Sequence, residues 1–188
     1  LNAERKAVYG PCVRLSVEGL RGGHSGAEIH KNRANANKVM GDFLGRIQKL
    51  MPLCLTSFSG GSKDNAIPRA CQATVVAMGI GLERINDIAA QLQQEVRETY
   101  DEPEALVQAF DVDALGGNAL TTAATADVIS LLCAAPNGVQ AYCPDMPELV
   151  QTSLNLGIAK LGDLFTATFS VRSSVNAEKE GLITKLKE

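Results

Sequence analysis

The residues best suited to chemistry lie in one short stretch, 19–30, whose sequence is GLRGGHSGAEIH. In this stretch His24 is enclosed by Gly22, Gly23 and Gly26, and glycine adopts backbone conformations that are closed to other residues. Histidine is the side chain most easily set as a donor, an acceptor or a cation near neutral pH. The pattern predicts a functional loop between a strand and a helix, although a histidine in such a loop equally suits a purely structural hydrogen bond.

Two further side chains are candidates for binding a small polar ligand. Asn65 lies in the loop 59–69, SGGSKDNAIPR, and its amide can both donate and accept. Arg172 lies on the polar side of an alternating strand, and its guanidinium suits a carboxylate, which it grips through two parallel hydrogen bonds. Each has a plain alternative, because Asn65 is typical of a turn and Arg172 of a solvated or ion-paired surface. Ser153 and Asn155 share a polar strand face and are interpreted as ordinary polar-face residues.

The chain has too few ligands for a zinc site of its own. A catalytic zinc usually takes three protein ligands, and the sequence has only two histidines, His24 and His30, with no HExxH, CxxC or HxD pattern. It also has no GxSxG nucleophile turn and no glycine-lysine phosphate loop. The sequence therefore predicts that this segment binds no metal and holds no self-sufficient active site.

Composition narrows the class of protein. The 188 residues are 45% hydrophobic and 21% charged, with a formal net charge of −3, which is ordinary for a globular protein and argues against a nucleic-acid surface. No apolar run approaches the roughly 20 residues of a membrane span. Five cysteines without CxxC spacing are expected to be free thiols, which fits a cytoplasmic location. The start at Leu1 and the end at Glu188, inside an expected helix, indicate a piece of a longer protein.

The elements that position the candidate residues follow from hydrophobic periodicity. Period-2 alternation is cleanest near the C-terminus, where two strands around residues 161–163 predict a hairpin. The expected strands are 11–20, 53–58, 71–80, 106–112, 139–143, 153–158 and 165–172, and the expected helices are 35–50, 85–100, 121–135 and 177–187. The predicted fold is α+β, with an antiparallel sheet and helices packed on one face. It is expected to form two tandem ferredoxin-like lobes, 1–114 and 115–188, the second truncated at its last helix.

The order of motifs resembles a known family. The strings GLRGGHSGAEIHKNRANANK, NAIPRA, PNGV, VQTSLNLG and SVRSS follow one another along nearly the whole chain, and GGHSG and NAIPR are the specific ones. Together they closely resemble the lid, or dimerisation, segment of the aminoacyl-histidine (Xaa-His) dipeptidases. These enzymes belong to the zinc metallopeptidase family that includes carnosinase, aminoacylase and carboxypeptidase G.

The resemblance implies a lid inserted into a catalytic domain that holds two zinc ions and hydrolyses dipeptides in the cytoplasm as a homodimer. The zinc ligands and the general base would lie in that missing domain, so the chain alone is expected to be inactive. On the family pattern His24 stabilises the oxyanion, Asn65 contacts the substrate, and Arg172 holds the substrate's C-terminal carboxylate. Ser170 departs from the pattern, because relatives often have Asp at this place.

A non-catalytic dimerisation module or a small-molecule-sensing α+β module is the alternative interpretation. The residues do not tell which dipeptides are preferred, or whether His24 serves its own chain's metal site or a partner's. The flanking sequence discriminates between these readings, because a dipeptidase requires His, Asp and Glu ligands on both sides of the lid.

Overall fold

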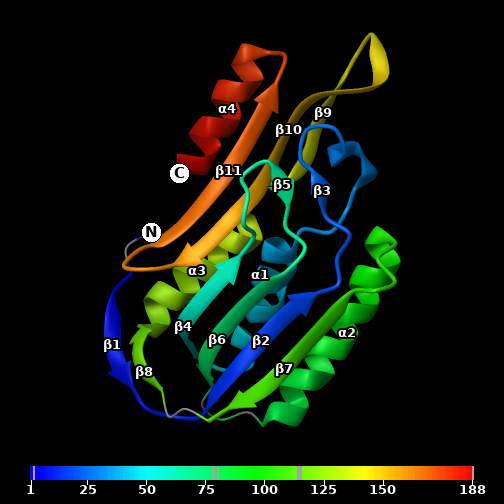
Figure 1. Cartoon of the computed structure of the whole chain (residues 1–188). Helices are drawn as coiled ribbons and strands as arrows, with labels where there is room; N and C mark the ends of the chain where they lie inside the picture. Colours follow the sequence, from blue (N-terminus) through cyan, green and yellow to red (C-terminus); the bar gives the residue numbers. More distant parts are fainter. Residues whose placement is uncertain (2, 78, 80, 114–115, 188) are drawn as a thin grey trace.

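The computed structural model describes residues 1, 3–77, 79, 81–113 and 116–187. Its strands are β1 (Arg5–Val8), β2 (Cys12–Glu18), β3 (Gly23–His24), β4 (Leu53–Gly60), β5 (Ala66–Ile67), β6 (Cys71–Ala77), β7 (Leu106–Val112), β8 (Gly117–Leu120), β9 (Gly138–Cys143), β10 (Met146–Leu161) and β11 (Phe165–Ser173). Its helices are α1 (Ala36–Gln48), α2 (Leu82–Tyr100), α3 (Thr122–Ala134), α4 (Asn176–Lys187) and the 3-10 turn η1 (Ile29–Lys31). Figure 1 shows β3 and β5 at the end of the molecule from which β9 and β10 project.

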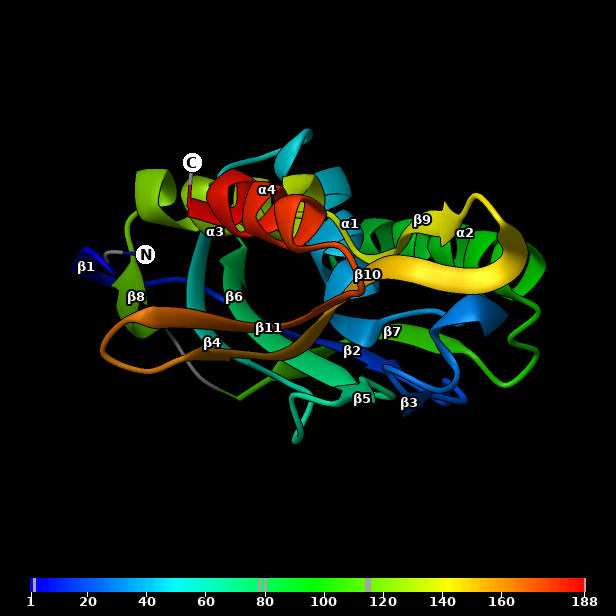
Figure 2. The same cartoon turned by 90° about the horizontal axis from the view of Figure 1, so that it is seen from above.

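Within the described residues, seven strands form one sheet in the order β11-β10-β4-β6-β2-β7, with β9 paired to β10. All of these pairs are antiparallel. Figure 2 shows α1, α2, α3 and α4 on the same side of the sheet. The predicted α+β class, with an antiparallel sheet and helices on one face, is confirmed.

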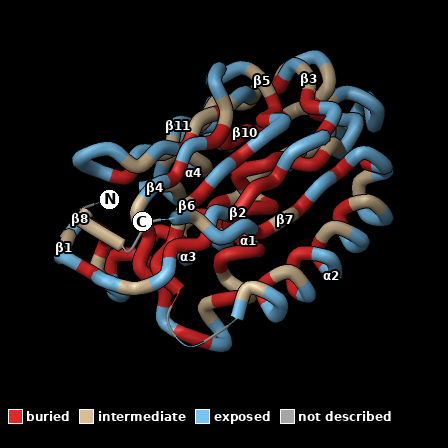
Figure 3. Tube along the Cα trace, turned by 60° about the horizontal axis from the view of Figure 1, so that its bottom comes forward, coloured by how far each residue is buried: buried red, intermediate tan, exposed pale blue. Residues whose placement is uncertain are grey.

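The core lies between the sheet and the helices, where the buried parts of both layers meet (Figure 3). α1 begins after Asn35, whose side-chain oxygen accepts from the backbone N–H groups of Asn37 and Lys38. The buried face of this helix carries Val39, Met40, Phe43, Leu44 and Ile47. Removing an apolar side chain of this size from water contributes about 1.5–3 kcal/mol, so this face holds α1 on the sheet. None of the described helices has the length and apolar character needed to cross a bilayer.

The two segments predicted as lobes share one sheet. β10 and β11 pair from Thr152↔Ser173 to Leu161↔Phe165, which confirms the predicted hairpin. β10 joins β4 of the first segment through the residues at the hairpin end of β10, including Ala159↔Gly60. The division predicted between residues 114 and 115 falls on two residues outside the described part of the chain, so it stays a prediction.

Loop 61–65 packs directly on β10 beyond the point where β10 leaves β4. Gly157 lies where the register of β10 against β11 shifts. A Cβ atom on Gly157 would lie 2.5 Å from the carbonyl oxygen of Asp64, and one on Gly61 would lie 1.9 Å from the carbonyl oxygen of Gly157. Only glycine allows two backbones to approach so closely, so this pair of residues brings the loop onto the strand.

Two short ribbons lie in segments for which no strand was predicted. β8 begins at Gly117 and pairs with β1 from Val8↔Gly117 to Arg5↔Leu120, and neither strand is among the predicted ones. In the loop 59–69, β4 extends to Gly60 and β5 pairs with β3. Both ribbons join segments that are distant in sequence, which local periodicity does not detect.

Candidate functional site

The ribbon of β3 and β5 carries His24 and Asn65 side by side. Its ladder pairs Gly23 with Ile67 and His24 with Ala66. The next backbone bond runs from the N–H of Ser25 to the carbonyl oxygen of Asn65, at 2.9 Å. The structure therefore brings together two of the three residues singled out in the sequence.

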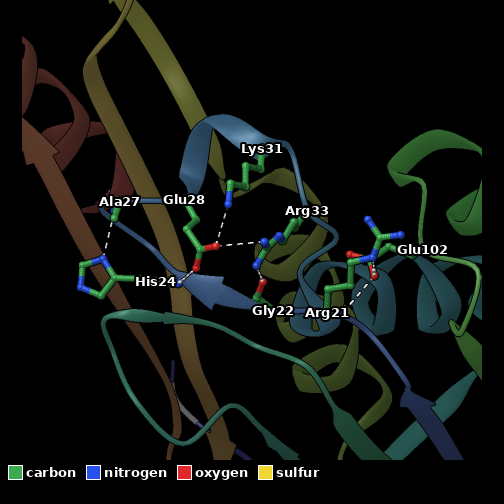
Figure 4. Close-up of polar contacts among 8 residues, drawn as sticks. All are labelled: Arg21, Gly22, His24, Ala27, Glu28, Lys31, Arg33 and Glu102. Atoms are coloured by element: carbon green, nitrogen blue, oxygen red, sulfur yellow. Dashed lines mark hydrogen bonds and ion pairs between the residues drawn. The ribbon is translucent and has the colours of Figure 1, made fainter.

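The hydrogen bonds of His24 define which ring nitrogen carries the proton. Nδ1 accepts from the backbone N–H groups of Gly26, at 3.1 Å, and Ala27, at 3.0 Å, and the second of these bonds is drawn in Figure 4. A nitrogen that accepts from two donors is unprotonated, so the neutral ring carries its proton on Nε2. The exposed His24 side chain is therefore prepared to donate a hydrogen bond from Nε2.

Glu28 holds the backbone at His24 and, through Arg33, at Gly22 (Figure 4). Its Oε2 accepts from the N–H of His24 at 3.0 Å, and its Oε1 accepts from Lys31 at 3.0 Å and from Arg33 at 2.9 Å. Arg33 also donates to the carbonyl oxygen of Gly22. The N–H of His24, followed by Lys31 and Arg33, lowers the pKa of Glu28 to about 2. Glu28 is thus an ionised anchor of the loop, which sequence reasoning missed, although its spacing to Lys31 and Arg33 was a usable signal.

Gly23 is required where this anchor passes the backbone. Its φ is +146°, and a Cβ atom there would lie 2.5 Å from Nη1 of Arg33 and 2.7 Å from Oε2 of Glu28. Any side chain at this position would displace both charged groups. The glycine enrichment of the motif therefore makes room for the ion pair behind His24.

A second carboxylate anchors the approach to β3. Glu102 has a fully buried side chain, and its Oε2 accepts from the backbone N–H of Arg21 at 2.9 Å (Figure 4). Arg21 itself reaches Asp101 at 3.4 Å. The turn between β2 and His24 is thus fixed from the end of α2.

Arg172 reaches the same region from β11. A Cβ atom on Gly26 would lie 3.1 Å from Cζ of Arg172 and 3.0 Å from Cε1 of His24, so both side chains contact the space beside Gly26. Arg172 is exposed and pairs with Ser153 in the β10–β11 ladder. None of the ion pairs between described residues uses Arg172. Its guanidinium is therefore available to a ligand next to His24.

Asn65 is exposed at the tip of the ribbon. Its N–H donates to Oδ1 of Asp64 at 2.8 Å, a local turn contact, and its carbonyl accepts from Ser25. The backbone of Asn65 thus has the turn role considered in the sequence, and its side-chain amide is exposed to solvent. The three predicted residues gather at one end of the sheet, and their roles in binding and catalysis stay predictions.

The interpretation of Ser153 and Asn155 as ordinary polar-face residues is wrong. They are 3% and 1% exposed, and Asn155 belongs to a buried amide network with Asn35 and Asn137. Alternation in the strand identifies a polar face, but it carries no information on what covers that face. The covering segments come from the helix cap, the PNGV loop and the loop of Asn65.

Among the described residues, no three His, Cys, Asp or Glu side chains are arranged to hold a metal ion. His24 and Glu28 are engaged with backbone groups and with Lys31 and Arg33, as described above. The donor set of this site therefore does not fit a metal centre, and it suits hydrogen bonding to an anionic or carbonyl ligand.

Part of the site lies in a range that a family model matches. A family model described as a peptidase dimerisation domain matches residues 15–104. The matched range covers a little less than half of the chain. The matched range contains the whole β3–β5 ribbon with His24 and Asn65, whereas Arg172 lies beyond it.

Similarity to dipeptidases extends beyond the matched range, over the whole chain. Cytosol non-specific dipeptidase of Escherichia coli (strain K12) is 32% identical over 190 residues, which cover 99% of this chain and 39% of that protein. The crystal structure of aminoacylhistidine dipeptidase from Vibrio alginolyticus matches with a TM-score of 0.92 and 30% identity, over 100% of this chain and 39% of that chain. The resemblance predicted from the motifs is confirmed, and the chain spans 39% of the length of each of these relatives.

Proposed function

We propose that this chain is the lid of a metal-dependent dipeptidase, in which it supplies binding groups to a metal site carried by another domain. The observation that carries the proposal is the convergence of His24 and Arg172 beside Gly26, in a chain similar to dipeptidases along its whole length. His24 as a hydrogen-bond donor and Arg172 as a cation lie beside the same residue, so they can bind the peptide carbonyl and the free carboxylate of one short substrate. A dimerisation or small-molecule-sensing module without catalysis is the competing function.

In this proposal His24 donates from Nε2 to the oxygen of the scissile carbonyl as negative charge develops on it. The two backbone donors to Nδ1 support this role, because they orient the ring and fix the proton on Nε2 before substrate arrives. Loss of one preorganised oxyanion donor typically lowers kcat by about 100- to 1,000-fold. His24 would therefore act on the transition state more than on substrate binding.

Arg172 and Asn65 would bind the ends of the substrate. A guanidinium holds a carboxylate through two parallel hydrogen bonds. Because this fixes the position of the substrate's C-terminus, only a substrate with the right distance between the scissile bond and the C-terminus fits. Such a clamp favours dipeptides over longer peptides. The names of the relatives give two substrate ranges, non-specific dipeptides and Xaa-His dipeptides. We propose Xaa-His dipeptides for this chain, by its similarity to the aminoacylhistidine dipeptidase over its whole length.

The metal would lie outside this chain. Zinc, as the family's usual ion, would activate the attacking water and polarise the carbonyl, and its ligands would come from the catalytic domain. We further propose a homodimer formed through the lid, with two lobes divided at residues 114 and 115. A cytoplasmic location is supported by the cytosolic E. coli relative.

The carboxylate clamp is tested with Arg172→Ala in the full-length protein, assayed on a dipeptide and on its C-terminal amide. Loss of hydrogen bonds to a charged group costs about 1.5–3 kcal/mol, so the KM for the dipeptide should rise by about 10- to 100-fold, with little change for the amide. Arg84→Ala is the matched control, because Arg84 is an exposed arginine paired with Asp87 on α2. An equal rise in KM for the dipeptide and for its amide would show that Arg172 does not bind the substrate's carboxylate.

The assignment of bond cleavage to another domain is tested on the purified fragment. The fragment should hydrolyse no carnosine and should contain no stoichiometric zinc by elemental analysis. Turnover by the fragment would contradict the division of labour between lid and catalytic domain.

A further inference from the structure

β10 carries a buried amide that reaches the loop of Asn65. Asn155 is 1% exposed, and its Nδ2 donates to the carbonyl oxygens of Asp64, at 3.3 Å, and Ala66, at 2.9 Å. These two carbonyls flank Asn65. A buried amide costs free energy unless its polar atoms are bonded, so the packing of Asn155 and the conformation of this loop depend on each other.

The orientation of this amide is fixed from the opposite side by α1. Oδ1 of Asn35 is occupied by the N–H groups of Asn37 and Lys38, so its Nδ2 is the atom that faces Oδ1 of Asn155, at 3.1 Å. With its oxygen directed at that donor, Asn155 presents Nδ2 to the loop. The helix cap thereby determines which atoms of Asn155 the loop meets.

The same strand also places Arg172. Arg172 pairs with Ser153 of β10, two residues before Asn155. His24 pairs with Ala66, whose carbonyl oxygen Asn155 holds. β10 therefore holds Arg172 through the register of the ladder and His24 through the side chain of Asn155.

We propose that Asn155 is a positioning residue, which sets the place of His24 and Asn65 relative to Arg172. The inference rests on the proposed function only in that these three residues bind the substrate. An aspartate at this position has the same shape, but its carboxylate would face the carbonyl oxygens of Asp64 and Ala66 without a hydrogen to donate. Asn155→Asp therefore removes the two bonds from Asn155 to the loop of Asn65 while the volume of the core is kept.

The first readout is hydrogen exchange, which does not depend on catalysis. In the full-length protein, peptides covering 22–28 and 63–67 should exchange at least about 10-fold faster in Asn155→Asp. The reason is that local opening of the ribbon costs less free energy when the two hydrogen bonds from Nδ2 of Asn155 are absent. Thr125→Val is the matched control, since it removes another buried hydrogen bond, from the N–H of Leu55 to Oγ1 of Thr125 at 3.0 Å. It should speed exchange around Leu55 and leave the ribbon unchanged.

The second readout separates positioning from general destabilisation. With a dipeptide as substrate, Asn155→Asp should lower kcat and raise KM together, and kcat/KM should fall on the order of 100-fold, as expected for misplaced catalytic groups. Thr125→Val, assayed where it is folded, should keep both constants. A structural role alone would reduce the fraction of active molecules, which lowers apparent kcat and leaves KM intact.

Unchanged exchange of the ribbon in Asn155→Asp would overturn the inference. Normal kinetic constants despite fast exchange would also overturn it. Failure of the proposed function has a different signature, because His24→Ala would then retain full activity, while the exchange data would still decide whether Asn155 holds the ribbon.

Discussion

His24 and Arg172, from β3 and β11, lie against the same space beside Gly26. A Cβ atom there would be 3.0 Å from Cε1 of His24, 3.1 Å from Cζ of Arg172 and 3.2 Å from its Nε. These atoms are the ends of flexible side chains, and the backbone of Gly26 is not in the left-handed region. Gly26 is therefore a spacer between the two proposed substrate-binding groups, and a substitution there acts on the site and not on the fold.

Gly26→Ala should change activity with little effect on stability. The added methyl group displaces His24 and Arg172 by a few tenths of an ångström, and kcat/KM should fall about 10- to 100-fold. The free energy of urea unfolding should stay within about 0.5 kcal/mol of the parent. Gly181→Ala in α4 is the control, because a Cβ there meets nothing within 4 Å. Gly181→Ala should stabilise the fold by roughly 0.5–1 kcal/mol and leave the kinetic constants unchanged. Full activity in Gly26→Ala would contradict the contact of His24 and Arg172 with the space beside Gly26.

Glu28 should make the stability of the fold depend on pH in the acid range. Its pKa is about 2 in the folded protein and 4.5 in its ordinary state, with the N–H of His24 as the largest cause. The pKa of Glu28 is lower in the folded state than in the unfolded state. The contribution of Glu28 to the free energy of unfolding is therefore complete above pH 4.5 and is lost as pH falls from 4.5 to 2. Glu28→Gln removes this dependence. The difference between parent and variant in urea unfolding should shrink across this window, and a difference that is constant with pH would refute the anchor.

Two glycines of α1 should respond oppositely to alanine. A Cβ on Gly41 would lie 2.7 Å from Cβ of Leu132 on α3, whereas one on Gly45 would make ordinary contacts of 3.5 Å with Cys133 and 3.7 Å with Ile129. Overpacking costs about 1–3 kcal/mol, so Gly41→Ala should lower the free energy of unfolding. Gly45→Ala should raise it by roughly 0.5–1 kcal/mol, as expected for a helix interior. Thermal unfolding of both variants checks this, and changes of the same sign would contradict the close helix crossing.

The elements with clear local periodicity were predictable from the sequence. α1 was expected at 35–50 and spans Ala36–Gln48, and β7 was expected at 106–112 and spans Leu106–Val112. Their apolar residues repeat at the period of the element, because each element packs one face on the same core. His24 was also found locally, since the glycines around it mark an unusual backbone.

The contacts that give the site its geometry are not local, and the sequence did not predict them. Asn35 meets Asn155 across 120 positions, and Ser153 and Asn155 were misread because the segments that cover them are distant in the chain. The β3–β5 ribbon has two residues in each strand, which is too short for any periodic signal. Arg172 could be named from its motif, but its place beside Gly26 depends on the register of β10 and β11.

His24→Ala in the full-length protein shows whether His24 acts on the transition state. The measurement is kcat for a His-dipeptide with zinc content determined on the same samples. His30→Ala is the matched control, because His30 is an exposed histidine in η1 close to the same loop. We expect kcat to fall about 100- to 1,000-fold in His24→Ala with zinc retained, and to stay unchanged in His30→Ala. An unchanged kcat in His24→Ala, or a loss of zinc in proportion to rate, would contradict it.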